Sequence, residues 1–84
     1  ELPGGSRLEL FDYHGKNKKV KRDEEDTGLR HLAFCVDDVY KHEKELKKHN
    51  VKIILPTTEL ENLGVRVLLF LGPDDEVIEF CERL

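Results

Sequence analysis

The sequence predicts a single α+β domain: a βαβββ module with a curled mixed sheet, one main helix on the outer face of the sheet, and an additional N-terminal strand. Three observations predict it. Eighty-four residues suffice for one small domain. Short apolar segments, bounded by Gly, Pro and Asp, precede and follow one charged segment that has the periodicity of a helix. Side chains also alternate between the two faces of a strand, and in the first and last of these apolar segments this alternation places the large apolar residues together on one face.

The first strand and the helix are predicted from one stretch of sequence. Residues 29–36 indicate a buried strand, because Leu, Ala, Phe, Cys and Val follow in near-continuous succession. Asp38 is a suitable N-cap for a helix over residues 39–50, since its carboxylate can accept from backbone N–H groups of the first turn. Val39 and Leu46 lie on the narrow apolar stripe of that helix.

Three further strands are predicted, over residues 51–55, 65–71 and 77–82. Pro56 is expected to end the first of them, and residues 57–63 to form a loop or a ragged strand end. Residues 65–71 are apolar except at one arginine, which is typical of a strand buried on both faces. Residues 72–75 form the turn before the last strand.

The N-terminal third is predicted to be organised differently. Residues 7–13 indicate a strand, and residues 14–27 a linker, because five basic residues within 16–22 are followed by four consecutive acids. Residues 28–84 then form the complete module. The chain has no methionine and begins with Glu1, so we expect it to be a piece of a longer protein.

Composition narrows the possible classes of partner. A net charge of −4 argues against general nucleic-acid affinity. No apolar run approaches the roughly 20 residues that cross a bilayer, so we expect no membrane partner and a cytoplasmic location. Cys35 and Cys81 lack the spacing of a zinc knuckle or redox pair and are expected to be reduced and buried.

A histidine and a glutamate on two predicted strands suggest a divalent-metal site. Strand parity places His31 and Glu79 on the sheet face opposite the large apolar residues that the helix covers. Glu9 has the same arrangement in the N-terminal strand. Imidazole nitrogen with carboxylate oxygen is a ligand set for Zn, Ni, Fe, Mn or Co. Taken singly, each residue is also compatible with a surface role.

The runs Gly28 to Asp38, Gly64 to Arg66 and Gly72 to Phe80 resemble the vicinal oxygen chelate superfamily. That group includes glyoxalase I, methylmalonyl-CoA epimerase, extradiol dioxygenases, and the fosfomycin and bleomycin resistance proteins. Its members pair βαβββ modules around a metal or ligand cavity. The resemblance implies that residues 28–84 are one module and residues 1–13 the last strand of a truncated first module.

The resemblance also implies roles for single residues. His31 matches the first-strand metal ligand of the second module, Glu79 its last-strand ligand, and Glu9 the last-strand ligand of the first module. The fourth ligand has no counterpart here. A second βαβββ module would supply it, either from sequence upstream of Glu1 or from a homodimer mate.

The function implied is a glyoxalase-like, metal-dependent lyase or isomerase of the lactoylglutathione lyase type, acting on a small molecule with adjacent oxygens. Glu79 is the candidate catalytic base, but Glu9 could equally serve, and the sequence does not choose between them. The competing hypotheses are a non-catalytic small-molecule binding module like the bleomycin resistance proteins, an epimerase or dioxygenase of the same superfamily, and a half-module without function by itself.

Overall fold

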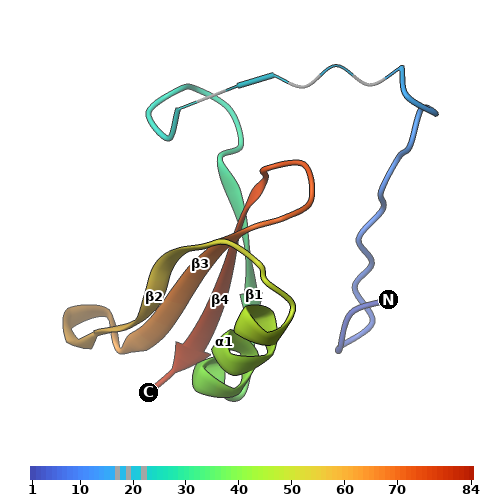
Figure 1. Ribbon diagram of the computed structural model, residues 1–84. Helices are drawn as coiled ribbons and strands as arrows, with labels where there is room; N and C mark the ends of the chain where they lie inside the picture. The colour runs from blue at the N-terminus through green and yellow to red at the C-terminus, as the bar shows by residue number, and fades with distance from the viewer. Residues whose placement is uncertain (17, 19, 22) are drawn as a thin grey trace.

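One helix and one four-stranded mixed sheet make up the folded part of the chain (Figure 1). The computed structural model describes residues 1–16, 18, 20–21 and 23–84. The elements are β1 (His31–Cys35), α1 (Val39–Lys48), β2 (Ile53–Leu60), the 3₁₀ turn η1 (Glu61–Leu63), β3 (Val65–Leu71) and β4 (Val77–Arg83). This order confirms the α+β class and the βαβββ module.

The strands are ordered β1, β4, β3, β2 across the sheet. β1 and β4 are parallel, and the other two neighbouring pairs are antiparallel. The first and last strands of the module therefore lie side by side, with Ala33 opposite Glu79 and Cys35 opposite Cys81. This register brings together residues that are more than forty positions apart in the chain.

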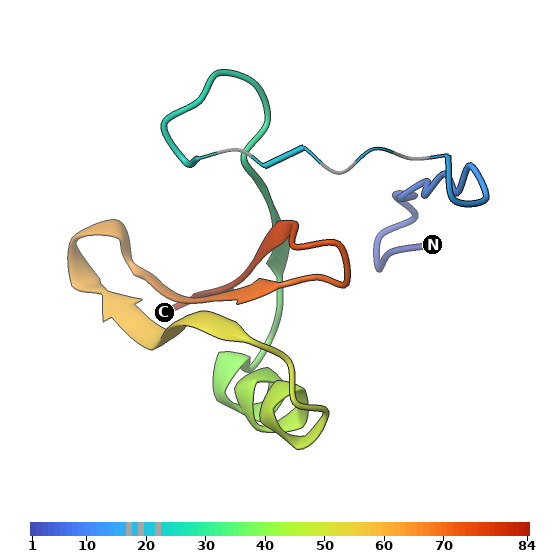
Figure 2. The same ribbon diagram turned by 45° about the horizontal axis from the view of Figure 1, so that its top comes forward.

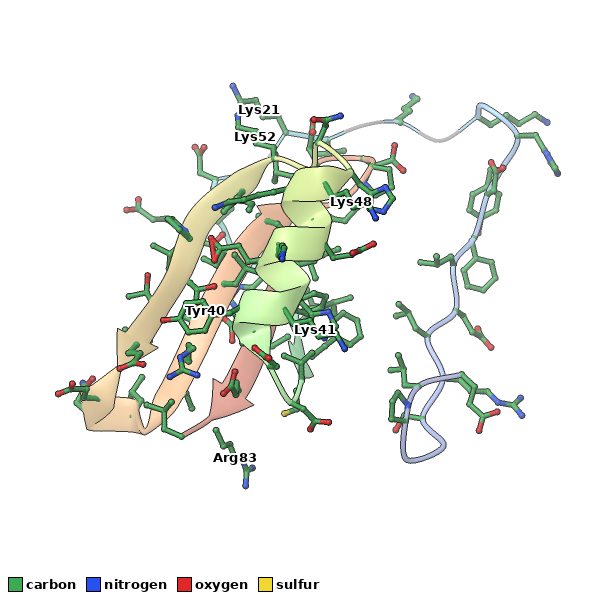
Figure 3. All side chains as sticks on the ribbon, turned by 60° about the horizontal axis from the view of Figure 1, so that its bottom comes forward. Lys21, Tyr40, Lys41, Lys48, Lys52 and Arg83 are labelled. Atoms are coloured by element: carbon green, nitrogen blue, oxygen red, sulfur yellow. The ribbon has the colours of Figure 1, made fainter. Side chains whose placement is uncertain are left out.

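The helix begins as the sequence predicts and ends slightly earlier. The Asp38 carboxylate accepts from the Lys41 backbone N–H at 3.2 Å, which confirms the predicted cap. The helix ends at Lys48, and Asn50 then takes a left-handed φ of 58° that turns the chain toward β2. Lys41 and Lys48 mark the side of α1 that faces away from the sheet (Figure 3).

The predicted end of β2 at Pro56 is wrong, because the strand continues to Leu60. β2 lies at an edge of the sheet, where proline removes no hydrogen bond from a second neighbour. The pairing with β3 also shifts register between Leu55 and Thr58, so Pro56 falls within an irregular stretch. The expected loop is thereby reduced to η1, which Gly64 closes with a φ of 66°.

The core lies between α1 and one face of the sheet (Figure 2). Val39 of the helix and Leu68 of β3 are fully buried, and Phe70 is nearly so. The Phe80 ring of β4 contacts the Phe70 ring edge-on, with 4.8 Å between centroids. These contacts confirm that the apolar set of β4 lies under the helix.

The other face of the sheet has no helix over it (Figure 2). We call it the open face; strand alternation assigns to it Val65, Val67, Leu69 and Leu71 of β3, Val77, Glu79 and Cys81 of β4, and His31, Ala33 and Cys35 of β1. The sheet twists but is not strongly curled, contrary to the prediction. Four strands give an open sheet, and closing it around a cavity takes more strands.

The predicted N-terminal strand is absent from the sheet. Residues 7–13 are extended but pair with no strand in the described part of the chain, and Leu10 and Phe11 are exposed. Figures 1 and 2 both show this segment as an arm separate from the sheet. A strand needs a neighbour for its backbone hydrogen bonds, and the module's own edges do not provide one here. That residues 1–13 end a preceding module stays a prediction.

No helix in the described part of the chain is long and apolar enough to cross a membrane. Cys35 is exposed and Cys81 is half-buried, and both are free thiols. The prediction that both cysteines are buried is therefore wrong for Cys35. Its strand is at the sheet edge, and its side chain lies on the open face.

Candidate functional site: a histidine and glutamate pair on the open face

The structure brings His31 and Glu79 together. His31 lies opposite Val77 in the parallel pairing of β1 and β4, so Glu79 is its diagonal neighbour on the same face. The distance from His31 Nε2 to Glu79 Oε1 is 3.5 Å. The histidine side chain is 37% exposed and the glutamate side chain 21% exposed. Both groups are therefore accessible from the open face.

A third residue, Glu24, contacts the other nitrogen of the same imidazole. Its Oε1 lies 3.2 Å from His31 Nδ1, within hydrogen-bonding distance. If Nδ1 carries the proton, Nε2 is left with its lone pair toward Glu79. Metal-ligating histidines usually donate their second N–H to a carboxylate in this way. The sequence offered no signal for Glu24, since it lies within a run of four acids.

Glu9 does not join this pair. It is exposed in the N-terminal arm, and the described residues contain no group of three or more His, Cys, Asp or Glu that could hold a metal ion. This chain by itself therefore presents two of the predicted donors side by side. The role of Glu9 as a ligand stays a prediction.

The surroundings of Glu79 are apolar. In the pairings of β4 with its two neighbouring strands, Glu79 is opposite Ala33 of β1 and Leu69 of β3. On its own strand, Val77 and Cys81 are the nearest residues on the same face. A carboxylate among apolar neighbours is costly unless it is paired, hydrogen-bonded or coordinated. His31 is the ion-pair partner found for Glu79, and it is charged only when protonated.

The spacing of the two donors suits a shared metal ion. Two ligand atoms, each about 2.1 Å from a tetrahedral zinc ion, are about 3.4 Å apart. The observed separation of His31 Nε2 and Glu79 Oε1 is 3.5 Å. Imidazole nitrogen and carboxylate oxygen also match the donor preferences of zinc and the other divalent metals predicted. The pair therefore fits half of a four-ligand site.

A second polar cluster lies on the helix side of the sheet. Arg66 of β3 pairs with Glu59 of β2 and with Glu82 of β4, at 2.5 and 2.8 Å. The hydrogen bond that the Arg66 guanidinium donates to the Glu59 carboxylate is the main cause that raises the pKa of Arg66. Glu82 also accepts from the Val39 backbone N–H at 2.7 Å, and Tyr40 stacks on the guanidinium at 4.9 Å. This cluster fastens the start of α1 to the sheet.

Glu43 makes a second connection between helix and sheet. Its Oε2 accepts from the Thr57 hydroxyl at 2.5 Å and from the Thr57 N–H at 3.2 Å. The side-chain hydrogen bond from Thr57 is the largest cause that lowers the pKa of Glu43. Sequence reasoning missed this contact, although a glutamate beside the apolar stripe of a helix indicates a need for a partner. Both clusters are structural and lie away from the open face.

The other histidines are placed apart from this site. His49 Nε2 lies 3.1 Å from Glu45 Oε1 one helical turn away, and both side chains are more than 60% exposed. His42 packs against the Phe80 ring, with centroids 4.9 Å apart. Neither reaches the open face. The His49 and Glu45 pair provides a matched control for the pair on β1 and β4.

A family model described as the Glyoxalase/Bleomycin resistance protein/Dioxygenase superfamily matches residues 1–80. The chain belongs to this superfamily. The match confirms the resemblance inferred from the sequence, and it includes the N-terminal arm as well as the βαβββ module.

Individual proteins are also similar to this chain. The chain is 35% identical over 86 residues to the uncharacterized protein YaeR of Escherichia coli, covering 98% of this chain and 62% of that protein. A glyoxalase family protein from Enterococcus faecalis superposes with a TM-score of 0.66 at 25% identity, over 80% of this chain and 52% of that one. One from Bacillus cereus shares the fold, with a TM-score of 0.62 at 23% identity over 71% and 40%.

The chain therefore spans about three-fifths of the length of its curated relative and about half or less of these two solved structures. One βαβββ module is present where the matched proteins have further sequence.

Proposed function

We propose that this chain forms one half of the active site of a glyoxalase-like, metal-dependent lyase or isomerase. His31 and Glu79 hold a divalent metal ion together with donors from a second βαβββ module. The observation that carries the proposal is the 3.5 Å separation of His31 Nε2 and Glu79 Oε1 on an uncovered sheet face. Membership of the superfamily supports it.

The residues of this chain have distinct parts in the proposed chemistry. His31 binds through Nε2, and Glu24 holds the proton on Nδ1 and fixes the ring. Glu79 either binds through a carboxylate oxygen or takes a proton from a substrate carbon as general base. A bound divalent ion supplies Lewis-acid stabilisation of negative charge on adjacent substrate oxygens. The half-buried position of Glu79 limits competing water around the proton transfer.

The proposal includes a second module for two reasons. The described residues provide too few metal ligands, and they provide no layer over the open face. Structural and catalytic zinc sites use at least three protein ligands, and two are paired here. The open face also carries Val65, Leu69 and Leu71 of β3, which are half-buried and have no layer above them in the described part of the chain, beside Val67, which is buried. A longer chain that includes this segment, or a second copy of it, supplies the missing layer.

Metal analysis tests the proposal directly. The purified chain is loaded with Zn, Ni or Mn, and the bound ion is quantified by mass spectrometry after removal of free metal. We expect binding that His31→Ala and Glu79→Gln each reduce at least about tenfold. The variant His49→Ala is the control, because it removes a histidine from an otherwise similar pair with Glu45. Equal binding by all four proteins contradicts the proposal.

Activity and assembly are measured on the same samples. Sedimentation shows whether metal binding accompanies dimer formation, and the hemithioacetal of methylglyoxal and glutathione is the substrate tested. Isomerisation that requires His31 and Glu79 supports a lyase. A chain that binds small molecules with no divalent ion supports instead the non-catalytic binding module of the same superfamily.

A further inference from the structure

Cys35 and Cys81 face each other on two neighbouring strands. They are partners in the parallel register of β1 and β4, and alternation puts both side chains on the open face. The Val36 N–H donates to the Cys81 carbonyl at 2.9 Å, which holds the two backbones together at this point. Both thiols are free. The fold therefore pairs two thiols that lie 46 positions apart in the sequence.

The strand spacing fits a bond between the two sulfurs. Facing residues on adjacent strands lie about 4.8 Å apart, and the Cα atoms of a disulfide are usually about 4.4–6.8 Å apart. The thiol pair therefore needs no change of register or of strand order to form a disulfide. The bond also uses only the two side chains that the register already brings together, so it requires no further group.

The pair is open to a small oxidant. Cys35 is exposed, and both cysteines line a surface cavity where β1 ends. Burial raises the pKa of the Cys81 thiol, so little of it is thiolate at neutral pH. Cys35 is therefore the thiol that reacts first with an oxidant from solution, and Cys81 completes the bond.

We propose that Cys35 and Cys81 are an oxidation site, which a low-molecular-weight disulfide such as glutathione disulfide converts into a reversible intrachain disulfide. The Cys35 thiolate attacks one sulfur of the oxidant, forms a mixed disulfide and releases one glutathione. The Cys81 thiolate then attacks the Cys35 sulfur and releases the second glutathione. The two cysteines lose two electrons and two protons in all, and the oxidant is reduced to two molecules of glutathione.

The bond fastens an edge strand to the sheet. β1 has β4 as its neighbour and no strand on its other side within the described residues. A covalent link to β4 is therefore expected to slow the local opening of β1. His31 lies on this strand, but the oxidation site does not rest on the proposed lyase or isomerase activity.

Anaerobic incubation with glutathione disulfide at about pH 8, followed by alkylation of the remaining thiols, tests the site. Mass spectrometry of the native chain is expected to show the loss of two hydrogen atoms and a tryptic product that joins residues 31–41 to residues 67–83. Cys81→Ser keeps the exposed thiol and is expected to stop at the mixed disulfide with glutathione. Cys35→Ser is expected to react at least about tenfold more slowly, because its remaining thiol is half-buried.

The urea-unfolded chain is the control for the register. The second step is expected to be at least about tenfold slower there, since no strand pairing holds the thiols together. Hydrogen exchange of the native chain gives a second measurement. The β1 amides are expected to exchange at least about tenfold more slowly in the oxidised form, while the amides of residues 7–13 are unchanged.

Four results overturn the proposal. The native chain stays reduced, or it accumulates the mixed disulfide at Cys35, which means that Cys81 does not reach the Cys35 sulfur. Disulfides that form only between two chains place the second thiol on another copy. An equal rate of the second step in the folded and unfolded chains shows that the fold does not align the pair.

Discussion

The two faces of the sheet are both apolar, yet within the described residues only one has a helix packed on it. On the helix side, Leu68 is fully buried beneath α1. On the open side, its neighbour Leu69 is half-buried and lies opposite Glu79. The difference shows that hydrophobicity alone does not distinguish the covered face of this module from the uncovered one. The polar pair His31 and Glu79 lies on the uncovered face.

The largest expected effect is on the covered face. Leu68→Ala is expected to lower the free energy of unfolding by about 2–5 kcal/mol, because it removes buried methyl groups and leaves a cavity. Leu69→Ala changes the adjacent residue on the other face and is expected to cost about half as much or less in the monomer. Urea denaturation of both variants measures the contrast. Equal costs mean that the open face is already covered in solution.

A charge on the open face tests whether a second copy covers it. Leu69→Asp is expected to weaken self-association at least about a hundredfold, because an unpaired carboxylate would be buried in the interface. Leu10→Asp makes the same chemical change on a side chain that is 87% exposed in the N-terminal arm. Sedimentation equilibrium gives the dissociation constants. If the native chain stays monomeric at high concentration, the homodimer is excluded. A second module from a longer chain is then the remaining source of a cover for the open face.

Glu24 is expected to act on the metal through His31. Glu24→Ala is expected to lower divalent-metal affinity by about 10- to 100-fold, since the imidazole loses the acceptor for its Nδ1 proton. Glu24→Gln keeps an oxygen acceptor and is expected to restore part of the affinity. Competitive metal titration measures the affinity, and nitrogen NMR of the ring reports its tautomer. Glu25→Gln is the neighbouring control, and an equal loss there argues for a general charge effect.

The smallest expected effect concerns Glu43 beneath the helix. Its pKa is lowered in the folded chain, so the unfolded state binds the proton more readily, and the carboxylate stabilises the fold at neutral pH. That contribution is lost as the pH falls below about 5 and through the lowered pKa. Glu43→Gln is expected to cost about 1 kcal/mol at pH 7 and less at low pH. Denaturation across pH checks it, and parallel pH profiles for both proteins would exclude this role.

Much of the module could be predicted from residue patterns. The cap at Asp38, the apolar run of β3 and the turn before β4 are local features, and the structure has all three. The strand end at Pro56 was mispredicted because the tolerance of proline depends on β2 lying at an edge, which its sequence does not show. The prediction of a strand over residues 7–13 was wrong for a similar reason, since a strand needs a neighbour to pair with.

For the site, the sequence by itself determined that His31 and Glu79 lie on the same side of their strands, because side-chain alternation is a local property. Tertiary structure alone decided that β1 pairs with β4 in parallel, which sets the 3.5 Å contact and also aligns Cys35 with Cys81. It likewise decided that Glu24 reaches His31 and that Glu9 does not join them. Register and long-range contacts depend on the packing of the whole sheet, so no short segment encodes them.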